Sequence, residues 1–83
     1  MDLLHISINE KVTVKLRHGR ELSGKLVAYD DHLNLMLSDT IEKIKETKID
    51  PKTSREVPFI VKKEHSIVFV RGDLVIMLAP LSQ

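Results

Sequence analysis

The sequence contains no cysteine and only three glycines. The absence of cysteine excludes a disulfide framework and a thiolate metal site, and it fits a reducing compartment. With so few glycines, the chain has neither a phosphate-cradling Gly-x-x-x-x-Gly-Lys-Ser/Thr loop nor the Gly-x-Ser-x-Gly elbow of serine hydrolases. These absences remove several common classes of enzyme.

The chain also has little net charge and no long apolar run. A formal net charge of +1 argues against a globally basic binder, so a nucleic acid would have to bind at a local site. No apolar run approaches the roughly 20 residues that span a bilayer. Residues 1–5 lack the basic region and apolar core of a signal peptide. We therefore expect no membrane association and a location in the cytosol or nucleus.

Metal-binding and catalytic constellations are missing as well. Asp30 and Asp31 are adjacent, so in a strand they would point to opposite faces and would not act as a catalytic pair. No spacing places two histidines on one helix or strand face; the four histidines are His5, His18, His32 and His65. We expect no metal, no cofactor and no enzymatic activity.

The length of 83 residues leaves room for one domain. A domain this small is only marginally stable alone and needs a disulfide, a metal or a partner. Since cysteine is absent and no metal site is expected, partner subunits are the favoured source of extra stability.

The first half of the chain predicts a short helix and two strands. Asp2 is placed to cap a helix over residues 2–9, with Leu4 and Ile8 on one face. From residue 11 onward apolar residues alternate with polar ones, which predicts a half-buried strand up to a turn at His18-Gly19. Residues 21–30 form the next strand, in which Gly24 marks a bend or a close backbone approach.

The second half predicts three further strands. After a polar break at residues 30–32, alternation resumes at Leu33, and the highly charged residues 39–56 predict two solvated strand ends projecting as a hairpin with a turn at 50–54. Strands over 57–71 and 74–78 flank a tight Arg71-Gly72-Asp73 turn, in which Gly72 is expected to supply a positive φ.

The end of the fourth strand, residues 67–70, and the fifth strand, residues 74–78, are apolar on almost every residue, which predicts burial on both faces. The apolar runs lie around Val68 and Val75. An exposed edge of this kind would be an aggregation hazard unless another chain covers it. Head-to-tail pairing with a neighbouring subunit closes into a ring when the rotation allows.

Two segments resemble the paired motifs of the Sm/Sm-like (LSm) family. The segment LSGKLVAYDDHLN, residues 22–34, resembles the first Sm motif, and IVFVRGD, residues 67–73, resembles the second. The two motifs lie in the expected order, and the resemblance covers nearly the whole chain. Within the family, the sequence is most similar to the third subunits of the eukaryotic Sm-like rings.

The resemblance implies a mostly β Sm fold, in which a short N-terminal helix precedes a strongly bent, SH3-like, five-stranded antiparallel barrel. It implies a single Sm domain over residues 1–83. Its parts would be the helix at 2–9, the first Sm motif at 12–38, the charged hairpin at 39–56 and the second Sm motif at 66–80. It further implies seven-membered rings in which the fourth strand of one subunit pairs with the fifth of the next.

The resemblance also implies a uridine pocket. His32 matches a position that stacks on the base, Arg71 matches one that covers its other face, and Asn34 matches one that reads the uracil edge. Gly72 is expected to offer its backbone N–H, while Asp30 and Asp73 brace the two loops. Such a pocket suits single-stranded RNA, whose unstacked bases can be stacked and read on their edges.

The implied function is that of one subunit in a hetero-oligomeric ring that binds uridine-rich single-stranded RNA. Such rings act in the nucleus on the 3′ end of the spliceosomal U6 small nuclear RNA, and in the cytoplasm with decapping and decay factors. Two alternatives stay open at this point. The chain could serve as a ring scaffold that acts through protein–protein contacts of its charged hairpin, or as a homomeric RNA chaperone.

Overall fold

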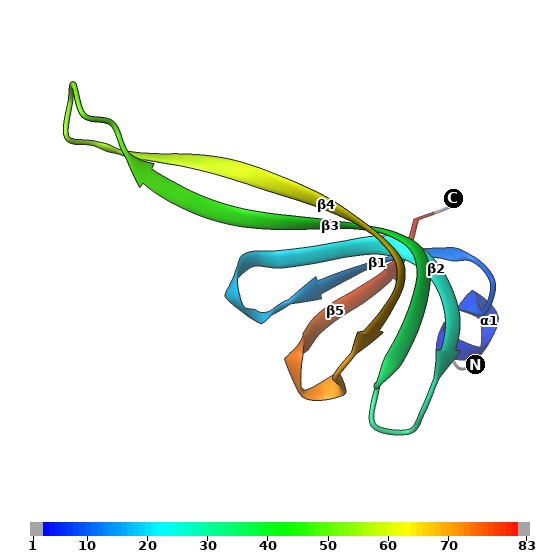
Figure 1. Cartoon of the computed structure of the whole chain (residues 1–83). Helices are drawn as coiled ribbons and strands as arrows, with labels where there is room; N and C mark the ends of the chain where they lie inside the picture. Colours follow the sequence, from blue (N-terminus) through cyan, green and yellow to red (C-terminus); the bar gives the residue numbers. More distant parts are fainter. Residues whose placement is uncertain (1–2, 82–83) are drawn as a thin grey trace.

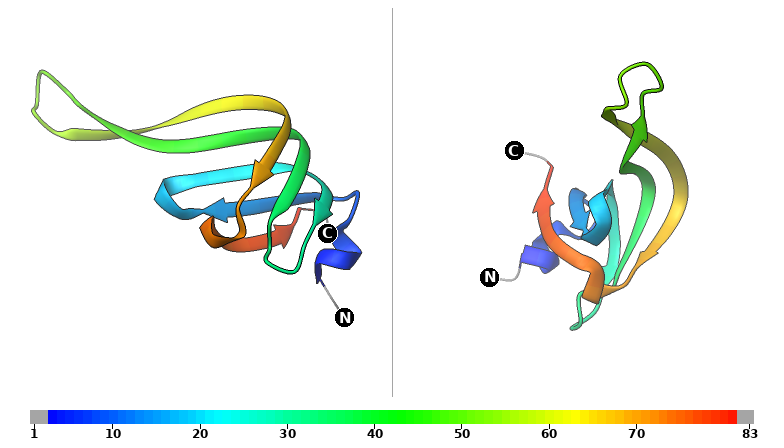
Figure 2. Two further views of the ribbon diagram at one scale, coloured as in Figure 1. Left: turned by 60° about the horizontal axis from the view of Figure 1, so that its bottom comes forward. Right: turned by 90° about the vertical axis from the view of Figure 1, so that its left-hand side faces the viewer.

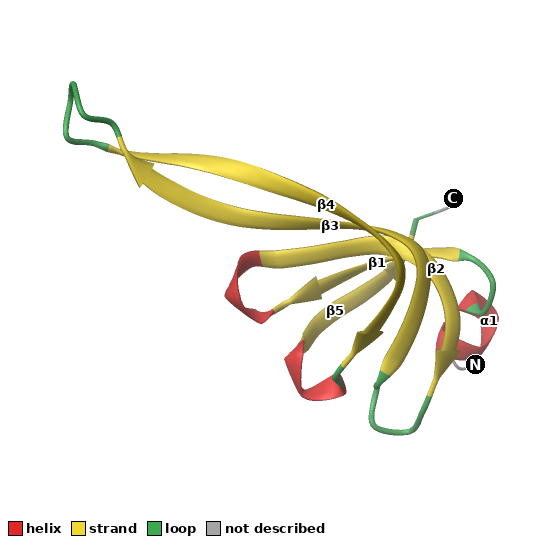
Figure 3. Ribbon diagram, viewed as in Figure 1, coloured by secondary structure: helices red, strands yellow, loops and turns green. Residues whose placement is uncertain are grey.

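The computed structural model describes residues 3–81, which form a short helix and a single five-stranded antiparallel sheet (Figures 1 and 3). The strand order in the sheet is β4-β3-β2-β1-β5. The predicted fold class is therefore confirmed. The elements are α1 (Leu3–Ser7), β1 (Lys11–Leu16), η1 (Arg17–Gly19), β2 (Arg20–Tyr29), β3 (Leu35–Ile49), β4 (Glu56–Val70), η2 (Gly72–Leu74) and β5 (Val75–Pro80).

The core consists of the inward-facing residues of these alternating strands. Its buried members are Val12, Val14, Leu22, Leu26, Leu35, Leu37 and Val70. Each fully buried aliphatic side chain contributes about 1.5–3 kcal/mol by leaving water, and partly buried apolar residues pack around this cluster.

Helix α1 lies over one end of the core. Leu4 and Ile8 pack against the core, as their spacing predicted. Leu3 and Ile6 point outward, with 42% and 52% of their surface exposed. The cap predicted at Asp2 lies outside the described residues. The helix is too short to be stable alone, so its packing on the sheet must hold it.

Gly24 allows the sheet to bend. A Cβ at this position would lie 2.5 Å from Oγ1 of Thr40 and 2.9 Å from the carbonyl oxygen of Ser38. The β2–β3 register shifts between Ser23 and Lys25, which adds a local irregularity at the same point. The predicted close backbone approach is confirmed, and Figure 2 shows the strong curvature of the strands that results.

Strands β3 and β4 continue past the body of the sheet as a long hairpin (Figure 1). The hairpin gives the molecule its extended shape of 52 × 24 × 22 Å. Asp50 closes its turn, because its backbone N–H donates to the carbonyl oxygen of Arg55 at 2.9 Å and its carboxylate accepts the N–H of Lys52 at 2.9 Å.

The structure corrects two expectations about the strands. Leu33 does not begin a strand; it has a φ of 63° and is 39% exposed, and β3 starts at Leu35. The C-terminal strands are not buried on both faces either. Phe69 is 74% exposed and Ile76 is 66% exposed, because no other element of the described chain packs on the faces from which they project. Strands β4 and β5 are also the two edges of the sheet.

No helix within residues 3–81 has the length and apolar character needed to cross a membrane.

Candidate nucleic-acid interface

The loop between β2 and β3 is organised by the carboxylate of Asp30. Its Oδ1 accepts the backbone N–H groups of His32 at 2.8 Å and Asn34 at 3.0 Å, while its Oδ2 accepts a hydrogen bond from Nδ2 of Asn34 at 2.9 Å. The hydrogen bond from the Asn34 side chain is the main cause that lowers the pKa of Asp30, and the two backbone N–H groups act in the same direction. The charged carboxylate is therefore the form that holds the loop.

A single hydrogen bond joins this loop to the turn between β4 and β5. The backbone N–H of Gly72 donates to Oδ1 of Asn34 at 2.7 Å. Both loops lie at the same end of the sheet, at the lower edge of Figure 1. Asn34 thus links the two segments that the sequence predicted as the halves of one site.

Gly72 has a different role from the two that were expected. Its φ is not positive, and its N–H is already bound to Asn34. Glycine is needed for space instead: a Cβ here would overlap the carbonyl oxygen of His32 and lie 2.9 Å from the carbonyl carbon of Leu33. The second turn can approach the first only because residue 72 has no side chain.

The two side chains expected to flank a base are both exposed to solvent. His32 projects from the first loop, whose backbone Asp30 holds. The guanidinium of Arg71 forms an ion pair with Asp73 at 2.8 Å. The side chain of Arg71 is 78% exposed, and that of Asp73 is 61% exposed. This pair positions the arginine but adds little stability, since exposed ion pairs contribute about 0–1 kcal/mol.

An open groove of about 580 Å³ lies beside the two loops. Asp30, Asn34 and Arg71 line it together with apolar residues, whereas His32, Gly72 and Asp73 do not. The apolar part of the wall consists of Ala28, Tyr29, Leu35, Met36, Phe69 and Val70. The predicted residues are therefore brought to one place, but they do not all line one cavity of the single chain.

Within residues 3–81 there is no group of three or more histidine or acidic side chains that could hold a metal ion. The chemistry that the loops offer is that of a binding site: an oriented amide, an exposed imidazole and an exposed guanidinium. An amide can donate and accept, while flat rings and guanidinium planes can stack on bases.

The model of the LSM domain family matches residues 2–80. The chain belongs to this family. Among curated relatives, the Sm-like protein LSM3B of Arabidopsis thaliana is 45% identical over 80 residues, covering 96% of this chain and 82% of the relative. The probable U6 snRNA-associated Sm-like protein LSm3 of Dictyostelium discoideum is 46% identical with the same coverage. Within the family the chain is thus LSm3-like, as its motifs indicated.

Solved structures of Sm proteins share the fold of this LSm3-like chain. A heptameric archaeal Sm protein superposes with a TM-score of 0.70 at 30% identity, covering 95% of this chain and 96% of the other. The Pyrococcus abyssii Sm protein in complex with a uridine heptamer gives a TM-score of 0.68 at 29% identity, covering 95% and 93%.

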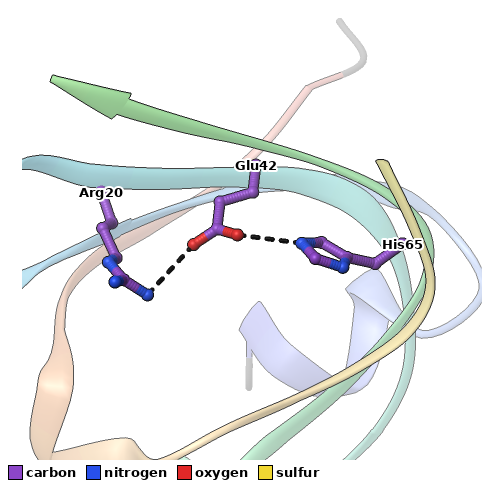
Figure 4. A network of polar contacts seen from close by, with 3 residues as sticks. All are labelled: Arg20, Glu42 and His65. Atoms are coloured by element: carbon purple, nitrogen blue, oxygen red, sulfur yellow. Dashed lines mark hydrogen bonds and ion pairs between the residues drawn. The ribbon is translucent and has the colours of Figure 1, made fainter. Parts of the chain in front are cut away.

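A polar network at the base of the hairpin was not predicted from the sequence of this Sm-like chain. Glu42, whose side chain is only 11% exposed, accepts a hydrogen bond from Arg20 at 3.2 Å and contacts Nε2 of His65 at 2.9 Å (Figure 4). Glu42 lies at an inward position of β3, opposite Leu22. Alternation along the chain offered no signal for this network, because the period set by Leu35 and Leu37 shifts by one residue at Asp39, whose φ is 49°, and this shift turns Thr40 and Glu42 inward.

Proposed function

We propose that this chain is one subunit of a hetero-oligomeric, heptameric Sm-like ring that binds uridine-rich single-stranded RNA, with residues 1–83 acting as a single Sm domain. The observation that supports the proposal most is the hydrogen bond between Asn34 and Gly72, which joins the two motif loops. It brings a base-reading amide to the same end of the sheet as His32 and Arg71.

The side-chain amide of Asn34 is held in one orientation, so a base would meet its donor nitrogen and its acceptor oxygen in fixed positions. Its Oδ1 holds the Gly72 N–H and its Nδ2 donates one hydrogen to Asp30, so the oxygen and the nitrogen are each fixed in place. An amide oxygen has a second lone pair and an amide nitrogen a second hydrogen. These remaining sites complement the N3–H donor and a carbonyl acceptor of uracil.

His32 and Arg71 supply the two faces of the proposed sandwich. Both are exposed and project from the loops that Asn34 links. Stacking on a side chain contributes about 1–3 kcal/mol per base. Asp30 holds the first loop in place, Asp73 holds the guanidinium, and Gly72 permits the close approach of the two loops. One such pocket reads about one nucleotide, so high affinity requires several linked pockets in a ring.

Ring formation would solve the problem of the exposed edges. Strands β4 and β5 end the sheet with unpaired backbone edges, and Phe69 and Ile76 are largely exposed there. Pairing of β4 in one subunit with β5 in the next would bury both edges in a head-to-tail contact. The archaeal structure that resembles this chain is heptameric, which supports the proposed number of subunits.

The name of one relative supports the nuclear part of the proposed cellular role. The Dictyostelium relative is named for association with the U6 snRNA. We assign the chain to a nuclear ring on the 3′ end of U6 small nuclear RNA, with splicing factors, and to a cytoplasmic ring with decapping and decay factors. Affinity purification from the nucleus and from the cytoplasm of the source cell tests this assignment. Recovery of neither set of factors would contradict it.

The RNA pocket is tested in the assembled ring. Replacement of His32, Asn34 and Arg71 by alanine should weaken binding of a short oligouridine about tenfold, as expected when one stacked base is lost. Asp31→Ala in the same loop is the matched control, because Asp31 forms no hydrogen bond or ion pair within residues 3–81. Unchanged affinity of the triple variant would refute the pocket assignment.

A scaffold role is the second candidate function. The hairpin extends from the body of the sheet, and Ile49 and Ile60 on it are 60% and 56% exposed. These exposed apolar residues favour a protein contact. RNA crosslinks confined to other subunits of the ring would support the scaffold, whereas crosslinks to His32 or Arg71 would count against it. Native mass spectrometry of the chain alone tests the homomeric alternative.

A further inference from the structure

Leu33 lies in the loop between β2 and β3 with a left-handed backbone conformation (Figure 1). Its φ is 63°. Within residues 3–81, the other non-glycine residues with a positive φ are all polar, namely Asn9, His18, Asp39 and Ser54. Asparagine, aspartate and histidine tolerate this conformation better than other L residues do. Leu33 is therefore an aliphatic residue at a position where asparagine or glycine would be less strained.

The side chain of Leu33 does not serve the core. It is 39% exposed. It belongs neither to the buried core nor to the partly buried apolar residues that pack against the core. Burial of apolar surface is what an aliphatic side chain contributes to stability. The core of the described chain thus gives no reason for a leucine at this strained position.

Asp30 holds the strained residue in place. The backbone N–H of Leu33 donates to the carbonyl oxygen of Asp30 at 3.2 Å. The N–H groups of its neighbours, His32 and Asn34, donate to Oδ1 of Asp30 at 2.8 Å and 3.0 Å. Three successive N–H groups are therefore bound to one residue. Strained conformations persist where the surroundings determine them in this way, and they gather at ligand-binding sites.

Ring assembly through the edge strands would not cover Leu33 by strand pairing. The loop joins β2 and β3, each of which already has a strand on both sides, whereas the proposed ring pairs β4 with β5. Leu33 stands outside the open groove of about 580 Å³, and so does His32. The side chain of Leu33 is therefore open to a ligand that stacks on His32.

We propose that Leu33 is a further contact residue of the uridine pocket, and that its side chain packs on the C–H edge of the base and on the ribose. The inference rests on the function proposed above. His32 and Asn34, on either side of Leu33, take the face and the polar edge of the base. An aliphatic side chain has no donor or acceptor, so the C–H surface of the nucleotide is the part that it covers. Leu33 keeps its strained place because this contact needs an apolar side chain.

The test replaces Leu33 by residues that suit a positive φ. Leu33→Asn keeps the backbone conformation and removes the apolar side chain. In the assembled ring it should weaken binding of a short oligouridine at least about fivefold, as expected when an apolar contact is lost. The urea midpoint for unfolding of the full chain should not fall. A loss of affinity that comes with a lower midpoint would show that Leu33 serves the fold, and it would overturn the proposal.

Three companion variants identify the property that matters. Leu33→Gly removes the side chain without adding a polar group, and it should lose affinity as Leu33→Asn does. Leu33→Met keeps an apolar side chain of similar volume and should bind within about twofold of the unmodified ring. Ile49→Asn makes the same kind of change in the hairpin, at a side chain that is 60% exposed, and should leave binding unchanged. Retained affinity in Leu33→Gly, or equal losses in Leu33→Met or Ile49→Asn, would overturn the proposal.

Two further measurements identify the partner of Leu33. Salt screens charges and not apolar contacts, so the affinity ratio between the unmodified ring and the Leu33→Asn ring should be the same at low and high salt. A ratio that changes with salt would contradict an apolar contact. Native mass spectrometry should show an intact Leu33→Asn ring. Dissociation of the ring would mean that Leu33 contacts a neighbouring subunit, and it would overturn the contact with RNA.

The triple alanine variant of His32, Asn34 and Arg71 keeps this inference apart from the proposed function. If the triple variant binds oligouridine more weakly and Leu33→Asn does not, the pocket stands and only the contact by Leu33 is wrong. If the triple variant binds as tightly as the unmodified ring, the pocket itself is wrong, and the contact by Leu33 is refuted with it.

Discussion

The side-chain oxygen of Asn34 accepts a hydrogen bond from the backbone N–H of Gly72 at 2.7 Å, although the two residues are 38 positions apart in the sequence. Asn34 also uses its amide nitrogen to hold Asp30. One side chain therefore orders its own loop and attaches it to the second loop.

Asn34→Ala should uncouple the two loops. The free energy of unfolding should fall by about 0.5–1.5 kcal/mol, because two hydrogen bonds of an exposed side chain are lost. Hydrogen exchange at the Gly72 amide should accelerate, which NMR measures directly. Asn34→Asp is the informative companion: its carboxylate can still accept the Gly72 N–H but cannot donate to Asp30, so it should protect the Gly72 amide while loosening the first loop. Unchanged exchange in Asn34→Ala would refute the link.

Gly72→Ala should destabilise the chain through overlap rather than through backbone strain. The new methyl group would meet the carbonyl oxygen of His32, and forced overpacking costs about 1–3 kcal/mol. Gly19→Ala is the contrasting variant. Gly19 has a φ of 71°, but its Cβ would meet nothing closer than Lys45 Cβ at 3.5 Å.

We therefore expect Gly19→Ala to cost about 1 kcal/mol, from the conformation alone. In denaturant unfolding, Gly72→Ala should be the less stable of the two. It should also shift the NMR resonances of His32 and Leu33, which Gly19→Ala should leave in place. The reverse order of stability would show that the space between the loops is less restricted than the structure indicates.

The loop between β2 and β3 should lose its fixed conformation at low pH. The pKa of Asp30 lies below its usual value of 3.8, chiefly because of the hydrogen bond from the Asn34 side chain. Because the pKa of Asp30 is lower in the folded chain than in the unfolded chain, its carboxylate contributes its full stability at any pH above the unfolded pKa. This stability is lost as the pH falls through the folded pKa. The loop should therefore stay intact at neutral pH and loosen only below pH 3.8.

An NMR titration of the Asp30 carboxyl carbon measures this pKa. Asn34→Ala should move the midpoint of the titration upward, toward the usual aspartate value, because the largest lowering contribution is removed. The amide resonances of His32 and Asn34 should shift with the same midpoint in the unmodified chain. A midpoint at or above 3.8 in the unmodified chain would contradict the hydrogen-bonded loop.

Glu42→Ala should destabilise the base of the hairpin. It removes the acceptor that Arg20 and His65 share, at a position where the glutamate side chain is only 11% exposed. The side chains of Arg20 and His65 are 53% and 36% exposed, so they can turn to water and the cost should be about 1–2 kcal/mol. Glu64→Ala, at an exposed position of β4, is the control and should change stability by less than about 0.5 kcal/mol.

Chemical denaturation followed by circular dichroism gives both values. If Glu42→Ala and Glu64→Ala lower the free energy of unfolding equally, the contacts of Glu42 with Arg20 and His65 add no stability beyond the effect of removing one negative charge.

The local pattern of the sequence determined much of this protein. Alternation placed Val12, Val14 and Leu22 in the core, because side chains on a strand point to opposite faces in turn. Residue types alone predicted three local features: the turn at His18-Gly19, the close approach at Gly24 and the turn that begins at Asp50. Each of these features depends on residues that are near one another in the chain.

Tertiary structure alone decided the features that join distant segments. The pattern of β4 and β5 predicted burial on both faces, but whether a face is covered depends on what lies next to it, and these strands became the edges of the sheet. The sequence indicates that glycine at position 72 matters in the turn, but it does not show the physical reason why glycine is needed there. Glycine stands there because the backbone of His32, brought from far away in the sequence, leaves no room for a side chain.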